Sequence, residues 1–237
     1  MTQTQLDIAF AIHWLSRQLI SPTTGNLRAA MNLIRYLIRI KTYAISYRST
    51  SELVEIGPNT LYGYVDSDYA RCYSTGKSIY GYIFKINGGP ISWKAKRATT
   101  IALSTLEAEY TALSEATCEI LWYRGLFQEL QQLISVPTVL KGDNQGSIET
   151  AYNPKHHNRI KHTLLKFQFV REQIVAKTVI IDYIPTIWIA ADGLTKPLSK
   201  ILFTRFIAML GLVEYQTERR NWYSVILFYI IYIGLES

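Results

Sequence analysis

Four acidic residues stand where an acid is otherwise hard to explain: Asp66 and Glu109 in apolar segments, and Asp143 and Asp192 at turns. They are far apart in the chain, so only folding can bring them together. Clustered carboxylates repel one another and raise one another's pKa, and a divalent cation normally neutralises such a group. Hard oxygen ligands favour Mg²⁺ or Mn²⁺ over zinc. The four acids therefore predict the site of a metal-dependent nuclease, with two ions about 4 Å apart.

The N-terminal segment that precedes these acids has helical periodicity. Apolar residues recur at helical spacing at Ile8, Ile12, Leu15 and Leu19. The Ser-Pro-Thr-Thr-Gly sequence at 21–25 interrupts the pattern, and a second helix is marked by Ala29, Leu33, Tyr36 and Leu37. Residues 1–47 are thus predicted to form a helical hairpin.

From Leu61 the pattern changes to that of strands, which we expect at 61–66, 78–86 and 91–96. The turn Asn87-Gly88-Gly89 is a strong hairpin signal. A helix over about 104–133, a strand near 137–141 and a short helix after Asp143 follow. Another helix (161–176), a strand (178–183) and a final helix from Asp192 complete the order. This order predicts an α/β fold with a mixed sheet flanked by helices.

Composition narrows the class of protein. The chain has 237 residues, 49% of them hydrophobic, and a formal net charge of +7, which indicates a globular protein with a polyanionic partner such as nucleic acid. Two cysteines exclude a disulfide framework and a thiolate zinc site, so an intracellular setting, cytoplasm or nucleus, is expected. The apolar run Trp222–Leu235 is shorter than the ~20 residues of a spanning helix, so we do not expect a membrane partner.

Periodicity helps to choose among the acids. On a strand, Asp66 and Asp68 share a face, so alternation alone leaves both open as ligands. On the long helix, Glu109 falls at the edge of an apolar stripe and would be costly there unless something bound it. The stripe is formed by Leu106, Tyr110, Leu113 and Ile120. The other acids of this helix should be solvated: Glu107, Glu115 and Glu119.

Asp143 and Asp192 have a second explanation. Each precedes a predicted helix, and aspartate is a common N-cap residue. Capping and metal binding therefore both stay open for each of them.

Several motifs, in order along the chain, resemble the ribonuclease H region of copia-type LTR retrotransposon Pol polyproteins. They are Tyr64–Asp68, Ile91–Lys94, Leu103–Tyr110, Gly142–Gln145, Lys161-His162, Phe169–Glu172 and Ala191–Leu198. The resemblance runs from roughly 61 to 212. The stretch from Leu6 to Leu37 is also similar to the segment that joins the reverse transcriptase to the ribonuclease H in such polyproteins.

The resemblance implies a ribonuclease H-like fold with a mixed five-stranded sheet. It selects Asp66 over Asp68 and implies that Asp66, Glu109, Asp143 and Asp192 bind metal and carry catalysis. The activity it implies is cleavage of the RNA strand of an RNA/DNA hybrid, without a small-molecule cofactor. It also divides the chain into a connection remnant (1–57), a ribonuclease H-like domain (58–212) and an apolar tail (213–237).

Basic and aromatic residues are candidates for contact with the hybrid. They are Trp93, Lys94, Lys96, Arg97, Lys161 and His162. The simpler alternatives are a solvated helix around Lys161 and a core position for Trp93.

The chain departs from the family pattern in places. Leu164 stands where an aspartate is expected, Gln168 where a histidine is expected, and Gly193 where a branched apolar residue is usual; residues 187–189 replace a more polar run. These departures favour a rival reading, an inactive remnant that at most binds nucleic acid. An integrase-type nuclease on the same fold is a second rival, but it would use three acids in another order. A polymerase site is excluded because Ser67 separates Asp66 from Asp68 and only Asp7 lies upstream.

Overall fold

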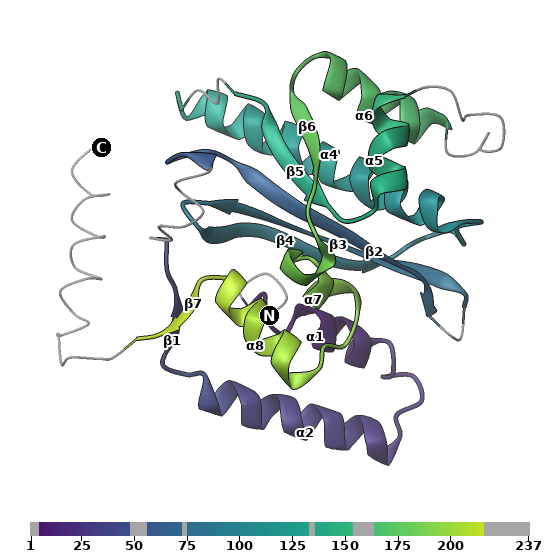
Figure 1. The fold of residues 1–237 in the computed structure, drawn as a ribbon. Helices are drawn as coiled ribbons and strands as arrows, with labels where there is room; N and C mark the ends of the chain where they lie inside the picture. Colours follow the sequence, from purple (N-terminus) through teal and green to yellow (C-terminus); the bar gives the residue numbers. More distant parts are fainter. Residues whose placement is uncertain (1–4, 48–55, 73–74, 133–135, 154–163, 216–237) are drawn as a thin grey trace.

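A mixed five-stranded sheet is the centre of the molecule. The computed structural model describes residues 5–47, 56–72, 75–132, 136–153 and 164–215 (Figure 1). The sheet has the order β4-β3-β2-β5-β6. Neighbouring strands are antiparallel on one side of β2 and parallel on the other. The bounds are β2 (Tyr62–Cys72), β3 (Lys77–Ile86), β4 (Gly89–Arg97), β5 (Thr138–Gly142) and β6 (Val179–Tyr183). This arrangement confirms the predicted α/β class.

The hairpin between β3 and β4 forms where the sequence predicts it. Asn87 and Gly88 both have positive φ, 52° and 80°. Two such residues in a row match the twist of the flanking strands, as in a type I′ turn. The turn brings β4 alongside β3, with Ile86 opposite Gly89.

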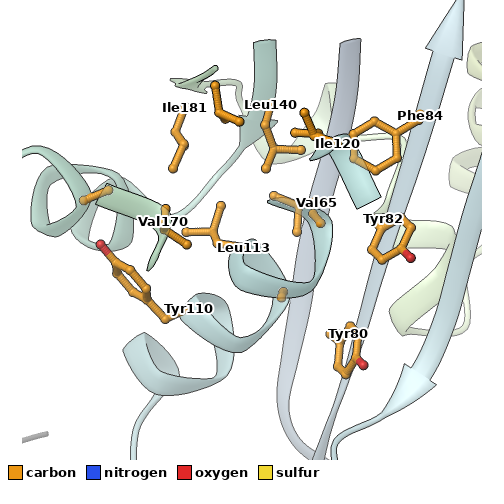
Figure 2. Packing of buried hydrophobic residues seen from close by; sticks show 14 of the residues in the cluster. Val65, Tyr80, Tyr82, Phe84, Tyr110, Leu113, Ile120, Leu140, Val170 and Ile181 are labelled. Carbon is orange, nitrogen blue, oxygen red and sulfur yellow. The ribbon is translucent and has the colours of Figure 1, made fainter. Parts of the chain in front are cut away.

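Three helices cover one face of the sheet: α4 (Thr105–Glu129), α5 (Gln145–Tyr152) and α6 (Leu164–Val175). The Ser104 side chain caps α4 by accepting a hydrogen bond from the Glu107 backbone N–H at 3.1 Å. The predicted stripe of α4 is confirmed, because Tyr110, Leu113 and Ile120 are buried. Figure 2 shows them packed with Val65 of β2 and neighbours from β3, β5, β6 and α6.

The N-terminal helices lie against the opposite face, together with the C-terminal ones (Figure 1). The elements are α1 (Ala9–Ser16), α2 (Thr24–Arg39), the 3-10 helix η2 (Thr186–Trp188), α7 (Asp192–Thr195) and α8 (Lys200–Met209). A small antiparallel pair, β1 (Tyr43–Ile45) and β7 (Leu212–Glu214), joins the segment after α2 to the C-terminal end of the described chain. Leu6 and Ala9 belong to the same core cluster as Tyr62 and Phe206. The predicted boundary at 57/58 therefore does not separate two hydrophobic cores.

Four sequence-based expectations differ from the structure. The helical hairpin is present, but α1 ends at Ser16, and Leu19 is 76% exposed rather than buried on its inner face. Helix α4 ends at Glu129, not near 133. The final helix is two helices, because the segment with Pro197, which cannot continue the hydrogen-bond ladder, separates α7 from α8. The first strand runs on to Cys72 instead of ending at Asp66.

Both cysteines are free, Cys72 buried and Cys118 exposed. Among the helices in the described part of the chain, none has the length and apolar character needed to cross a bilayer. The apolar segment Trp222–Leu235 lies outside the described residues.

Two glycines allow α7 to pack closely between β3 and α8. A Cβ on Gly81 would lie 2.6 Å from the Cβ of Leu194 and 3.1 Å from the carbonyl oxygen of Lys94. A Cβ on Gly193 would lie 2.5 Å from the Phe206 ring. The departure from the family pattern at Gly193 thus has a packing reason, since Phe206 fills the space of a side chain. Because Gly81 pairs with Asp66, the close approach brings α7 next to that acid.

We predict that Gly81→Ala lowers the free energy of unfolding by about 1–3 kcal/mol, because the new methyl group collides with Leu194. Gly125→Ala is the control. Gly125 lies in the exposed interior of α4 with open space around it, so alanine should raise the stability by up to ~1 kcal/mol. Urea unfolding of both variants measures the difference. An unchanged stability of Gly81→Ala would contradict the close packing of α7 on β3.

Candidate active site

Three of the four predicted acids meet in the structure. Asp66 lies on the central strand β2, Glu109 near the start of α4, and Asp143 directly after β5. One carboxylate oxygen from each lies within 4.8 Å of the others. Asp143 can reach Asp66 because β5 is the parallel neighbour of β2, with Tyr64 opposite Lys141. The fold thus joins residues that the sequence keeps far apart.

The fourth acid, Asp192, reaches the cluster through Asp66. It is the first residue of α7, and the Thr195 hydroxyl of the same helix donates a hydrogen bond to Asp66 Oδ2. Burial and the charge of Asp192 raise the pKa of Asp66 to about 7. Lys196 Nζ lies 2.7 Å from Asp192 Oδ1, so this acid already has an internal cation. Asp192 therefore lies beside the other three acids and is paired with a lysine.

The capping explanation for Asp143 and Asp192 is wrong. Asn144, not Asp143, caps α5, since its side chain accepts a hydrogen bond from the Ser147 N–H at 2.8 Å. Asp143 instead accepts a hydrogen bond from the Thr186 hydroxyl at 2.7 Å. Asp192 lies inside α7, whose N-cap position is Ala191 and has no side-chain cap. Neither Asp143 nor Asp192 therefore acts as the N-cap of a helix.

The positions of Asp66 and Asp68 agree with the selection of Asp66 as the candidate metal ligand. Asp66 is 4% exposed and belongs to the cluster. Asp68 forms an ion pair with Arg71 at 3.4 Å and is not part of the cluster.

The raised pKa values of Asp66 and Glu109 show that the negative charges of the cluster are not fully compensated in the folded protein. Burial, with the charges of Asp66 and Asp143 as further causes, raises the pKa of Glu109 to about 9. Near neutral pH Asp66 and Glu109 therefore resist being ionised together in the metal-free protein. Three clustered carboxylates are hard oxygen ligands, and a divalent cation would remove the repulsion among them. Asp66, Glu109 and Asp143 thus fit a Mg²⁺ or Mn²⁺ site.

The expectation that the remaining acids of α4 are solvated holds only in part, because Glu107, Glu115 and Glu119 are half-exposed and each also accepts a hydrogen bond from the protein. Glu107 Oε2 accepts a hydrogen bond from the Leu103 N–H at 2.7 Å and stabilises the start of the helix. Two tyrosines of β3 reach the other acids: Tyr80 donates to Glu115 at 2.9 Å, and Tyr82 donates to Glu119 at 3.0 Å. The alternation of tyrosines on β3 was the sequence signal for this layer of contacts.

The predicted nucleic-acid contacts of β4 lie on two faces. By the alternation of strand residues, Lys94 and Lys96 share one face, while Trp93 and Arg97 share the other. Lys94 Nζ lies 3.2 Å from Glu115 Oε2. Trp93 is half-buried and packs against the core cluster that contains Tyr62, as its alternative reading supposed. A role of these four residues in binding stays a prediction, and Lys161 and His162 lie outside the described residues.

Sequence reasoning missed the residues that orient the acids. Thr195 and Thr186 donate to Asp66 and Asp143, and Lys196 pairs with Asp192. Thr195 and Lys196 lie within a quoted motif, but nothing in their spacing indicated these contacts. The departures at Leu164 and Gln168 are exposed on α6. Trp188 is also exposed, and Arg205 stacks over its ring at 5.4 Å.

The sequence has clear relatives. It is 31% identical over 211 residues to the retrovirus-related Pol polyprotein from transposon RE2 of Arabidopsis thaliana. That match covers 89% of this chain and 14% of the polyprotein. The chain belongs to the copia-type Pol polyprotein family. It is also 39% identical over 122 residues to the secreted RxLR effector protein 161 of Plasmopara viticola, covering 52% of this chain and 82% of that protein.

No family profile matches this Pol-related chain. Among solved structures it is similar to LC11-RNase H1 in complex with an RNA/DNA hybrid, with 15% identity and a TM-score of 0.44. The match covers 57% of this chain and 94% of that one. The chain has a ribonuclease H-like fold, as the mixed five-stranded sheet with its flanking helices and the Pol relatives indicate.

We predict that Glu109→Gln changes how stability depends on pH in the metal-free protein. An acid whose pKa is higher in the folded state loses stabilising protonation as pH rises from its unfolded value near 4.5 to its folded value of about 9. The wild type should therefore lose stability relative to Glu109→Gln across this range. Melting curves in chelator from pH 5 to 9 measure the gap, which should widen with pH.

Saturating Mg²⁺ provides the second half of the same test. The cation should stabilise the wild type more than the variant, because it binds the folded cluster and the variant lacks the negative charge of one ligand. Parallel pH curves, together with equal shifts in Mg²⁺, would contradict this description of Glu109.

Proposed function

We propose that this chain is a metal-dependent endonuclease that cleaves the RNA strand of an RNA/DNA hybrid. The observation that carries the proposal is the convergence of Asp66, Glu109 and Asp143, with Asp192 beside them. The relationship to Pol polyproteins supports it. Because the chain spans 14% of the RE2 polyprotein, the activity of the whole polyprotein is not carried over.

The acids would hold one or two divalent cations. When bound, such a cation activates water for attack on a phosphodiester and stabilises the charge that develops on the phosphate. The protein's own residues supply orientation: Thr195 fixes the Asp66 carboxylate, and Thr186 fixes that of Asp143. No protein nucleophile is required, because water is the attacking group.

The proposed substrate follows from charge and shape. A net charge of +7 favours a polyanion. Contacts with 2′-hydroxyls across the shallow groove of a hybrid are what would distinguish its RNA strand from DNA. Cleavage would then be confined to the strand that carries these hydroxyls.

One observation favours a second candidate, binding of nucleic acid without cleavage. Lys196 lies 2.7 Å from Asp192 and partly supplies the positive charge that a metal ion would bring. A site neutralised in this way would be stable without metal and inactive. The two candidates differ in one measurable property, Mg²⁺-dependent cleavage.

We expect the purified chain to cut a labelled RNA/DNA hybrid in Mg²⁺ and to stop in excess chelator. Asp66→Asn should lower the rate by several orders of magnitude, because Asp66 is proposed to touch the metal. Asp68→Asn is the matched control. It changes the same group two residues away, outside the cluster, and should retain most of the activity.

The outcomes separate the candidates. Hybrid binding by the wild type without any cleavage would establish the second candidate. Equal cutting of duplex DNA would refute the proposed substrate. Equal losses in Asp66→Asn and Asp68→Asn, with both variants folded, would refute the assignment of Asp66.

A further inference from the structure

A cavity of about 770 Å³ lies between the N-terminal helices and the sheet, next to α7. Its walls come from α1 and α2, from the ends of β2 and β4, and from the segment between α7 and α8. Figure 1 shows α1 between the sheet and α2. The volume is within the range of small-molecule sites, roughly 300–1,000 Å³. The acid cluster does not line this cavity, although Lys196, the partner of Asp192, does.

Four cationic side chains and one acid line the cavity: Arg17, Arg71, Arg97, Lys196 and Asp7. Three of these five have partners of their own. Arg71 pairs with Asp68, Lys196 pairs with Asp192, and Asp7 accepts a hydrogen bond from Tyr36 at 2.6 Å. The remaining two, Arg17 and Arg97, therefore decide the charge of the cavity.

Arg17 and Arg97 converge without a counterion. Each places Nη1 3.6 Å from the sulfur of Cys72. Within the described residues, no carboxylate forms an ion pair with either of them. Arg17 Nε is buried and has no hydrogen-bond partner there. Two half-buried guanidinium groups without an anion are costly, unless a ligand supplies the negative charge.

The positive charge of the two arginines affects the pKa of the neighbouring residue His13. Burial, Arg17 and Arg97 together lower the pKa of His13 to about 4. His13 is therefore neutral near pH 7 and adds no charge of its own. The excess charge belongs to the two arginines, whose planar groups match the oxygens of a phosphate.

The rest of the wall is apolar and partly aromatic, formed by Phe10, Trp14, Leu15, Leu198 and Phe203. Trp14 is 37% exposed, so its ring is open to a ligand. Aromatic side chains stack on nucleic-acid bases irrespective of sequence. An apolar wall together with two guanidinium groups that have no counterion in the described part of the chain would suit a ligand with a planar aromatic group and an anionic group.

We propose that this cavity binds a nucleotide, with its phosphate on Arg17 and Arg97 and its base against Trp14. The nucleotide is either a free mononucleotide or one unit of a strand that runs past the acid cluster. Binding here requires neither a metal ion nor cleavage. The site can therefore be tested in chelator, where a failure of the proposed nuclease activity has no effect on the result.

The test measures equilibrium binding of adenosine monophosphate, inorganic phosphate and an RNA/DNA hybrid to the full chain in chelator. Arg17→Gln combined with Arg97→Gln should weaken binding of the nucleotide-bearing ligand at least tenfold. Arg39→Gln is the matched control, because it removes an exposed arginine of α2 that does not line the cavity. Melting temperatures establish that the variants are folded.

Trp14→Ala keeps both arginines and should weaken nucleotide binding while leaving the affinity for phosphate unchanged. Tight binding of adenosine monophosphate that depends on the arginines would identify a free nucleotide as the ligand. A loss confined to the hybrid, with no mononucleotide binding, would identify a strand nucleotide.

Two results would overturn the proposal. One is an unchanged affinity of the double variant for all three ligands. The other is binding of phosphate as tight as that of the nucleotide, with no effect of Trp14→Ala. If the double variant does not fold, the Trp14→Ala result decides alone.

Discussion

The burial of carboxylates that also repel one another is the constraint on which the rest of this structure depends. Asp66 and Glu109 are each less than 10% exposed, and their raised pKa values show that the fold holds them together against their preference for water. A protein interior tolerates this only where the surrounding structure is stable enough to impose it. The central strand β2 and the long helix α4, which share one hydrophobic core, provide that stability.

The elements around the acids act together to fix their positions. Gly81 allows α7 to contact β3, and this contact places Thr195 against Asp66. The parallel pairing of β2 with β5 brings Asp143 to the same place, where Thr186 orients it. The N-terminal helices pack on the face of the sheet that also carries α7, so they support the site even though they contribute no acid to it.

The sequence predicted what periodicity and motif order can encode. The stripe around Tyr110 set the orientation of α4, and with it the inward position of Glu109. Hydrogen bonds that depend on tertiary packing were not predictable: Asn144 rather than Asp143 caps α5, and Glu115 accepts a hydrogen bond from Tyr80. The cavity beside Arg17 was not predicted either, because it is formed by three segments that are far apart in the sequence.

A crystal structure of the protein soaked in Mn²⁺ tests the central claim most directly, since the anomalous signal of manganese locates the ion independently of the atomic coordinates. We expect a peak bounded by the carboxylates of Asp66, Glu109 and Asp143, at oxygen–metal distances of about 2.1 Å, close to those of the smaller Mg²⁺. A fully soaked crystal with no peak among these three acids, or with manganese bound only elsewhere, would contradict it.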